Sequence, residues 1–342
     1  MNDAHSLVSG TVHALVGSGH APAAVGVALR GSDQAVVTAG NLARPAPGAV
    51  EAGPGTLFAL GSITKTFTAL LLAEMAATGA VACDDPIRAH LPAEAVPRNG
   101  AAAITLGQLA AHRAGLPRLP RGLRRRSLPY LLSDPYARYR VEDLHRAVSR
   151  LRPPREAPQV RYSTFGVGLL GHLLARAAGT PYPELLAERV LTPLGMRDTL
   201  VPPEETLTRR AAVGHRRGRP VPHWRFDALE AAGALYSTGA DLLRYLQAQL
   251  HPDTVPEPLA TALLTARRQR HEDGGASLGW NVREIRGRTL LWHSGGTGGF
   301  TAFAGFSPDS AAGVAILAST APSLRQPVIH AARRLFRSVV FG

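Results

Sequence analysis

Lysine is almost absent from this chain of 342 residues. Lys65 is the only one, and the other 37 of the 38 Lys and Arg residues are arginine. Arginine supplies positive charge and salt bridges, but its guanidinium stays protonated at any pH that a protein meets. A desolvated ε-amine can instead become neutral and basic. The single lysine therefore indicates a task that requires a proton acceptor.

Cysteine is equally rare. Cys83 is the only one, so the chain cannot form an internal disulfide, which fits a reducing compartment. It precedes Asp84 and Asp85 and has no basic neighbour in the sequence, so we expect a structural residue rather than an activated thiolate. The 13 histidines contain no H-E-x-x-H pattern. We therefore predict no metal site and no cofactor.

Aromatic residues and long apolar runs are also few. Aromatic residues make up 6% of the chain and do not interleave with the arginine clusters at 118–126 and 209–219. Because stacking platforms for bases require such interleaving, we interpret the net charge of +13 as a solvated arginine-rich surface and expect no nucleic-acid partner. The stretch from Met1 to His20 lacks a basic segment and is broken by Ser, Gly and His. We expect no signal peptide, no membrane partner and a cytoplasmic location.

The secondary-structure signals in the sequence change along the chain. Two short β-prone runs at 24–30 and 34–39 are separated by Gly-Ser-Asp, which predicts a hairpin. The middle of the chain alternates helical patterns with Pro-rich loops, and the C-terminal part returns to strand-like runs. The further predicted elements are helices at 62–79, 165–178, 240–250 (capped by Thr238) and 322–339, and strands at 280–285, 289–293, 300–306 and 313–319.

This order of elements predicts a mixed α/β (α+β) fold. Strands near both termini with helices between them indicate one antiparallel sheet that is built from the two chain ends and flanked by helices. We expect a sheet domain from residues 1–61 and 271–342 and a mainly helical domain from residues 62–270. The active site is then expected between the two domains.

Ser62 stands three residues before Lys65, in the first turn of the predicted helix. Residues at this spacing lie on one face of a helix and reach each other. A helix start also provides backbone N–H donors and the positive end of the helix dipole. The pair is typical of a serine nucleophile and its activating base.

Two further segments accompany this pair in a fixed order. The chain has Ser-Ile-Thr-Lys at 62–65, Tyr-Ser-Thr at 162–164 and His-Ser-Gly at 293–295, with supporting landmarks at 110–117, 194–196 and 232–238. The set resembles the S-x-x-K, Y-x-N and K-T-G or H-x-G motifs of the serine β-lactamase and penicillin-binding-protein superfamily. It is most similar to the class C branch with its related esterases and transacylases. The resemblance covers about residues 22–335 and implies a β-lactamase/transpeptidase-like fold.

The resemblance also implies roles for the matching residues. Tyr162 would cooperate with Lys65 in taking the Ser62 proton and passing it to the leaving group. A phenol, whose ordinary pKa is about 10, acts as a base only where cations lower that pKa, and a neighbouring lysine does so. The backbone amides of Ser62 and Gly296 would form the oxyanion hole. The residues expected to bind substrate are His293, Ser294, Gly295 and Thr164.

Thr164 departs from the family pattern, which usually has Asn at this position. By resemblance, that Asn contacts the acylamino side chain of β-lactam and peptide substrates. Its replacement predicts weak β-lactamase and D-alanyl-D-alanine peptidase activity. The nucleophile and its bases are unaffected by the change.

A competing nucleophile lies near the C-terminal strands. The sequence Gly-Ala-Ser-Leu-Gly around Ser277 spells G-x-S-x-G, and Asp309 and His330 follow in the order of the α/β-hydrolases. A nucleophile elbow needs a strand before the serine and a helix after it. Ser277 instead leads into the predicted strand at 280–285, so we favour Ser62.

We therefore expect a serine-dependent acyl hydrolase, an esterase or amidase, that acts on an intracellular small-molecule ester, amide or thioester. One alternative is a transacylase that transfers the acyl group to an amine or alcohol in natural-product biosynthesis. The other is a catalytically inactive binding protein of the same fold. Retention of all three reactive side chains disfavours this last alternative.

Overall fold

A six-stranded sheet lies at the centre of the computed structural model, which describes residues 3–43, 50–123, 133–152, 160–268 and 277–342. The strand order is β2-β1-β10-β9-β8-β7, and every neighbouring pair is antiparallel. The prediction of one antiparallel sheet built from both chain ends is confirmed. The strands are β1 (Ala23–Arg30), β2 (Asp33–Gly40), β7 (Asn281–Ile285), β8 (Arg288–Gly296), β9 (Thr301–Ser307) and β10 (Ala312–Ala318).

The sheet is the middle of three layers, with helices on both of its faces. The side chains of β1 are accordingly buried on both faces. Successive side chains of a strand point to opposite faces. Val25, Val27 and Leu29 enter the larger core beneath the helical layer, whereas Ala24 and Ala28 enter a smaller core on the other face. β1 is therefore apolar along almost its whole length instead of alternating with polar residues.

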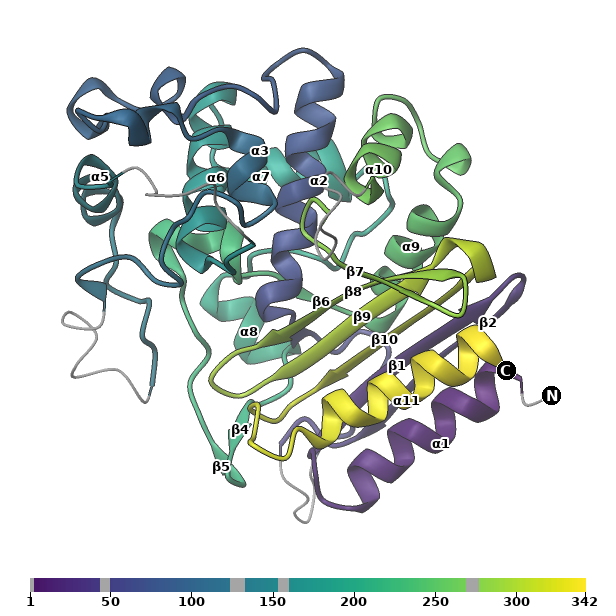
Figure 1. The fold of residues 1–342 in the computed structure, drawn as a ribbon. Coiled ribbons are helices and arrows are strands. Elements are labelled where there is room, and N and C mark those ends of the chain that lie inside the picture. Colours follow the sequence, from purple (N-terminus) through teal and green to yellow (C-terminus); the bar gives the residue numbers. More distant parts are fainter. Residues whose placement is uncertain (1–2, 44–49, 124–132, 153–159, 269–276) are drawn as a thin grey trace.

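Two terminal helices lie on the outer face of the sheet. α1 (Ala4–Gly17) and α11 (Pro327–Phe341) lie side by side across it (Figure 1). α1 was not among the predicted elements. The Asp3 side chain caps it by accepting a hydrogen bond from the Ser6 amide at 2.6 Å, and Val8 is among the α1 residues buried against the sheet. In the described part of the chain, no helix has both the length and the apolar character to cross a membrane.

The opposite face carries the helical layer (Figure 1). α2 runs through its middle and is buried from Thr64 to Met75. α9 packs directly on β1, β9 and β10, although it falls within the segment predicted to be the helical domain. The helices of this layer are α2 (Thr64–Ala77), α3 (Leu106–Ala110), α5 (Val141–Ser149), α6 (Thr164–Ala178), α7 (Tyr182–Leu186), α8 (Glu204–Arg210), α9 (Gly239–Leu250) and α10 (Leu259–Arg267).

Local signals in the sequence agree with the observed helix ends. α6 stops at Gly179, which adopts a left-handed conformation with φ of 66°. α9 starts at Thr238, whose side chain accepts a hydrogen bond from the Asp241 amide at 3.3 Å. The helix predicted at 62–79 begins one residue earlier, as the 3₁₀ turn η1 (Gly61–Ile63), and continues as α2.

Candidate active site

Ser62 lies in a turn that packs against the end of β8. The short strand β3 (Phe58–Ala59) leads into Gly61, which has φ of 51°, and then into η1 and α2. A Cβ atom at Gly61 would lie only 2.7 Å from the Gly296 nitrogen, and one at Gly295 would lie 1.9 Å from the Leu60 carbonyl oxygen. Only glycine permits this approach. It brings the backbone that carries Ser62 next to the backbone of Gly296.

Two side chains converge on the Ser62 hydroxyl. Ser62 Oγ accepts hydrogen bonds from Lys65 Nζ at 2.9 Å and from the Tyr162 hydroxyl at 2.7 Å. Lys65 Nζ also donates to the Ala232 carbonyl oxygen at 2.6 Å. The structure thus brings together the three residues that the sequence singled out, although Tyr162 is 100 positions from Ser62.

Lys65 is only 1% exposed. Burial lowers the pKa of its amine below the ordinary 10.5, because the charged form loses its hydration, and the positive charge of Arg118 lowers this pKa further. The negative charge of ionised Tyr162 and its hydrogen bond act in the opposite direction and only partly offset these effects. The amine is therefore more easily deprotonated than a solvated lysine.

Tyr162 is subject to opposing effects of the same kind. Burial raises the pKa of its phenol, but the charge of Lys65, the hydrogen bonds with Ser62 and Lys65 and the charge of Arg118 lower that pKa below 10 overall. Lys65 Nζ lies 5.2 Å from the centre of the Tyr162 ring, and the Arg118 guanidinium carbon lies 5.7 Å from it. The phenol is accordingly a better proton acceptor than free tyrosine.

His293 lies on β8 beside this group, with its ring centre 6.1 Å from that of Tyr162. Burial lowers the pKa of its imidazole to about 3, and the charge of Lys65 adds to the effect. The ring is therefore neutral at pH 7. Its Nδ1 donates a hydrogen bond to the Ser294 carbonyl oxygen at 2.9 Å, which leaves Nε2 as an acceptor.

The other residues predicted to bind substrate or to form the oxyanion hole lie on β8 and at the start of α6. Ser294 is exposed, and Gly296 pairs with Thr301 where β8 ends against η1. Thr164 is the first residue of α6; it is buried, and its amide donates to the Arg118 carbonyl oxygen at 3.0 Å. This bond ties the start of α6 to the segment that carries Arg118.

The structure adds His112 to the site. Its ring centre is 4.6 Å from that of Tyr162, and its Nδ1 accepts a hydrogen bond from the Ser163 amide at 3.2 Å. Burial, assisted by the charges of Lys65 and His293, lowers the pKa of His112 to about 3. The sequence landmark at 110–117 pointed to this segment but assigned no contact to the histidine.

An aromatic wall borders the same site. The Tyr136 ring stacks on Phe226 at 4.7 Å and meets Trp224 edge-on at 5.4 Å. Trp224 packs so closely on the glycine-rich run after β8 that a Cβ at Gly298 would lie 2.5 Å from its Nε1. The negative charge of ionised Tyr162 adds to burial in raising the pKa of Tyr136 to about 12. The wall therefore lies near Tyr162 and beside Gly298.

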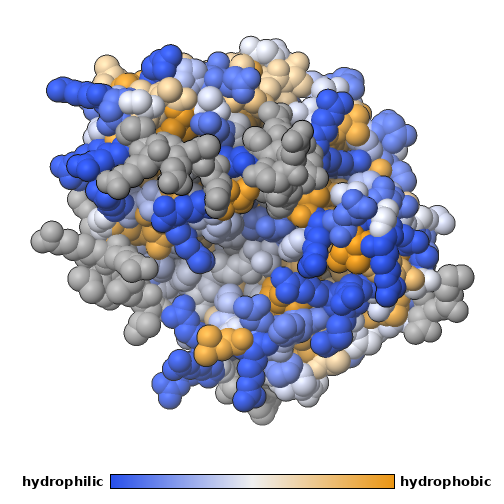
Figure 2. Space-filling view, viewed as in Figure 1, coloured by the Kyte–Doolittle hydropathy of each residue, from blue (hydrophilic) through white to orange (hydrophobic). Residues whose placement is uncertain are grey.

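In Figure 2 the surface is hollowed between the helical layer and the sheet. The floor of the hollow is pale, the colour of residues with intermediate hydropathy such as Gly, Ser and Thr. No group of three or more histidine, cysteine, aspartate or glutamate side chains suited to a metal ion occurs among the described residues.

Ser277 is placed quite differently. It is 1% exposed, and its hydroxyl has no hydrogen-bond partner among the described residues, so no base activates it there. The candidate partner Asp309 accepts a hydrogen bond from the Thr289 amide at 2.6 Å, and His330 lies on α11. Gly275 and Ala276 of the same motif lie outside the described residues.

Comparisons with known proteins identify the family and the fold. The family model described as Beta-lactamase matches residues 8–337. D-alanyl-D-alanine-carboxypeptidase/endopeptidase AmpH of Escherichia coli K12 is 30% identical over 283 residues, which cover 78% of this chain and 71% of that protein. A Beta-lactamase of Pseudomonas fluorescens is 29% identical over 304 residues, covering 77% and 79%. The crystal structure of a class C beta lactamase from Rhodobacter sphaeroides shares the fold, with a TM-score of 0.81 at 23% identity over 98% of this chain and 99% of that one.

Proposed function

Because this chain belongs to the beta-lactamase family of serine hydrolases, we propose that it cleaves an intracellular small-molecule ester or amide through an acyl-enzyme on Ser62. The observation that carries the proposal is the pair of hydrogen bonds on Ser62 Oγ, from Lys65 at 2.9 Å and from Tyr162 at 2.7 Å. A serine hydroxyl is a weak nucleophile until a base within hydrogen-bond reach removes its proton. Both candidate bases have a lowered pKa.

In the proposed reaction, Lys65 and Tyr162 take the Ser62 proton as Oγ attacks the carbonyl carbon of the substrate. The oxygen of the tetrahedral intermediate accepts hydrogen bonds from the Ser62 and Gly296 amides, each worth about 3 kcal/mol. Tyr162 then passes the proton to the leaving group, which departs and leaves an ester on Ser62. Water attacks this ester with the same bases in reversed roles and releases the acid.

The surroundings of the site narrow the proposed substrate. Thr164 replaces the expected Asn and is buried, so it offers no amide to the side chain of a β-lactam. The exposed Arg118 guanidinium beside the Tyr162 ring favours an acyl donor that carries an anionic group, and the wall formed by Tyr136 and Trp224 favours an apolar or aromatic one. We therefore propose a simple ester or amide as substrate rather than a cephalosporin.

The proposal is tested by trapping the acyl-enzyme. A fluorophosphonate should label Ser62, and peptide mapping should find the label there in the wild type and in Ser277→Ala, while Ser62→Ala remains unlabelled. Label on Ser277 with Ser62→Ala still active would contradict the proposal. The buried Ser277 is a suitable control because it is the competing G-x-S-x-G serine.

The same three residues would also support transfer to an amine or alcohol, because hydrolysis and transfer differ only in what attacks the acyl-enzyme. We expect p-nitrophenyl acetate to yield free acetate without any added acceptor. Mass spectrometry of the products with a panel of amines and alcohols measures this. An acyl-Ser62 species that persists in water and is released by one acceptor would identify a transacylase instead.

A further inference from the structure

The outer face of the sheet is only partly covered by helices. α1 packs on β1 and β2, and α11 packs mainly on β9 and β10. Two helices of about 10 Å diameter cover about four strands at a spacing of roughly 4.8 Å. The sheet has six strands. Part of the face formed by β7 and β8 consequently remains beside α11 without a helix over it.

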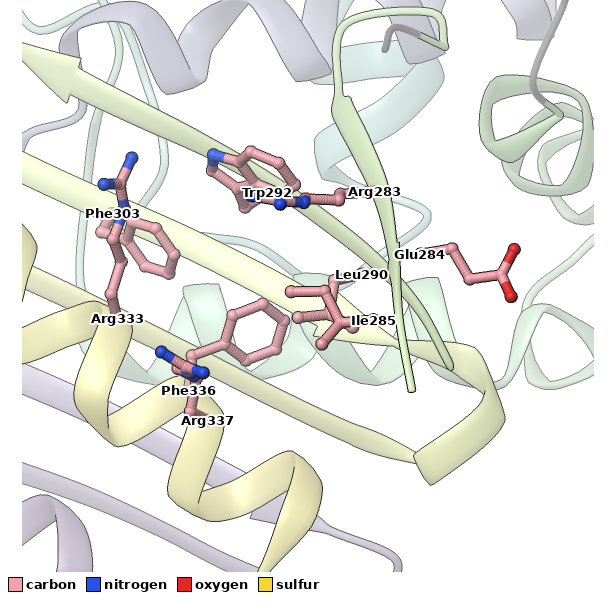
Figure 3. A pocket seen from close by; sticks show the side chains of 9 residues that line it. All are labelled: Arg283, Glu284, Ile285, Leu290, Trp292, Phe303, Arg333, Phe336 and Arg337. Carbon is pink, nitrogen blue, oxygen red and sulfur yellow. The ribbon is translucent and has the colours of Figure 1, made fainter. Parts of the chain in front are cut away.

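A cavity of about 590 Å³ lies at this place. Its floor is apolar and includes Trp292 of β8, Phe303 of β9 and Phe336 of α11, together with Ile285 and Leu290. Figure 3 shows the three aromatic side chains grouped around the cavity, with the two aliphatic ones beside them. Volumes of roughly 300–1,000 Å³ are usual for small-molecule sites.

The rim of this cavity is positively charged. Arg283 of β7 and Arg333 and Arg337 of α11 line it and are exposed. None of the three has an ion-pair partner among the residues that the structure describes. Glu284 is the single acid of the lining, and Figure 3 shows its side chain pointing away from the others.

Arg333 and Arg337 are also neighbours on one helix face, four residues apart. Like charges at this spacing repel each other by a few tenths of a kcal/mol. An anion bound between them would remove the repulsion and accept charge-assisted hydrogen bonds from both guanidiniums. The exposed part of the apolar floor belongs to Trp292 and Ile285, since Phe303, Phe336 and Leu290 are buried. An alkyl chain that covered these two side chains would at the same time remove their contact with water.

We propose that this groove, lined by Trp292, Phe303, Phe336, Arg333 and Arg337, binds a single-chain amphiphile with an anionic head, a fatty carboxylate or an alkyl phosphate. A small anion alone would leave Trp292 and Ile285 in contact with water, and a neutral chain alone would leave the guanidiniums without a counter-charge. An amphiphile of this class satisfies both features.

The groove is separated from the catalytic group by the thickness of the sheet. Trp292 and His293 are consecutive in β8, so their side chains point to opposite faces. Trp292 packs with the core under α1 and α11, whereas His293 faces Tyr162. Variants in the groove should therefore leave ester cleavage at Ser62 unchanged.

The test is isothermal titration calorimetry of the full chain with decanoate and with decyl phosphate, each below its micelle concentration. We expect both to bind, and the double variant Arg333→Gln/Arg337→Gln to weaken binding about tenfold, since each guanidinium contributes one charge-assisted contact. Trp292→Ala should weaken it about tenfold as well, through lost apolar contact. Comparison of the two ligands shows which head group is preferred.

Arg334→Gln is the matched control. It removes the same charge from the same helix, but Arg334 lines the opposite groove, between α11 and α1. The affinity of the Arg334→Gln protein for decanoate should equal that of the wild type. Unchanged thermal unfolding and unchanged ester cleavage in each groove variant would show that the fold is intact.

Three outcomes would overturn the proposal. Equal affinity of decanol and decanoate would remove the role of the arginines, and equal affinity of acetate and decanoate would remove the role of the aromatic floor. If neither monomeric ligand binds while anionic phospholipid vesicles sediment the wild type but not the double variant, the face is a membrane-contact surface instead.

Discussion

At the scale of single residues, the role proposed for Lys65, that of a base, is one that no arginine could take over. It is buried, and its amine contacts Ser62 Oγ and the Ala232 carbonyl oxygen. A guanidinium there would keep its proton and could not accept the one from Ser62. The lowered pKa of the lysine amine is the property that distinguishes the two side chains.

The substitution Lys65→Arg should therefore lower the rate of Ser62 acylation by about 10²–10⁴-fold, the range that a general base contributes. In the wild type this rate should rise with pH to a plateau, because the base form accumulates as pH increases. Its midpoint should lie below the ordinary pKa of lysine, since burial lowers the pKa of Lys65. Stopped-flow measurement of p-nitrophenolate release at several pH values tests both points.

Thermal unfolding of the same variant serves as the control for its fold. A loss below tenfold in a folded Lys65→Arg protein would show that positive charge alone suffices at this position. Lys65 would then act electrostatically rather than as a base.

At the scale of elements, the site depends on how closely α6 packs on the 3₁₀ segment η7 (Asp227–Ala232). Tyr162 stands two residues before α6, and the last residue of η7 is Ala232, whose carbonyl oxygen holds Lys65. Gly171 permits this contact, because a Cβ there would lie 2.1 Å from the Cβ of Ala231. The distance between the two elements thus determines where Lys65 is held.

Gly171→Ala should destabilise the protein by about 1–3 kcal/mol through overpacking and also lower ester cleavage. The matched control is Gly10→Ala in α1, where a Cβ would have no atom within 4 Å. This change should stabilise the protein by up to about 1 kcal/mol, because alanine is the better helix former. Urea unfolding of both variants measures the effect; equal stabilities would refute the close packing of α6 on η7.

At the scale of the whole molecule, burial makes stability depend on pH. His293 has its pKa lowered to about 3 by burial and by the charge of Lys65, so between that value and the ordinary 6.5 the unfolded chain holds the extra proton. The free energy of unfolding then falls as pH falls, by about 1.4 kcal/mol per pH unit for a fully shifted group. Burial raises the pKa of Glu230 to about 7, with help from Asp227 and Glu184. The contribution of Glu230 to the pH dependence of stability has the opposite sign, because between its ordinary pKa and about 7 the folded chain holds the extra proton.

These opposite signs give a paired prediction for the interval from about pH 5 to pH 6. Compared with the wild type, His293→Gln should reduce the increase of unfolding free energy with pH by about 1 kcal/mol per pH unit, and Glu230→Gln should enlarge it by about as much. Urea unfolding at several pH values within this interval measures the slopes. Identical slopes in all three proteins would show that neither group is shifted by the fold.

Local features of this protein could be read from the sequence. The hairpin of β1 and β2, the end of α6 at Gly179 and the cap of α9 at Thr238 depend on residues within a few positions of each other. The nearness of Ser62 and Lys65 follows from helix geometry alone. α1 was missed because its apolar residues, such as Val8 and Val12, are interrupted by Ser, Gly and His, and its helical form depends on burial against the sheet.

Long-range features were decided by tertiary structure. Tyr162 lies 100 residues from Ser62, and the Ala232 carbonyl that holds Lys65 lies 167 residues away. The family motifs suggested the first contact, but no local pattern predicts the second or the ring contact of His112 with Tyr162. The lowered pKa of Lys65 likewise requires the packed layers that exclude water from it. Propensity and spacing act along the chain, whereas burial and electrostatics act through space, so the sequence supplied the reactive groups and the fold determined their chemistry.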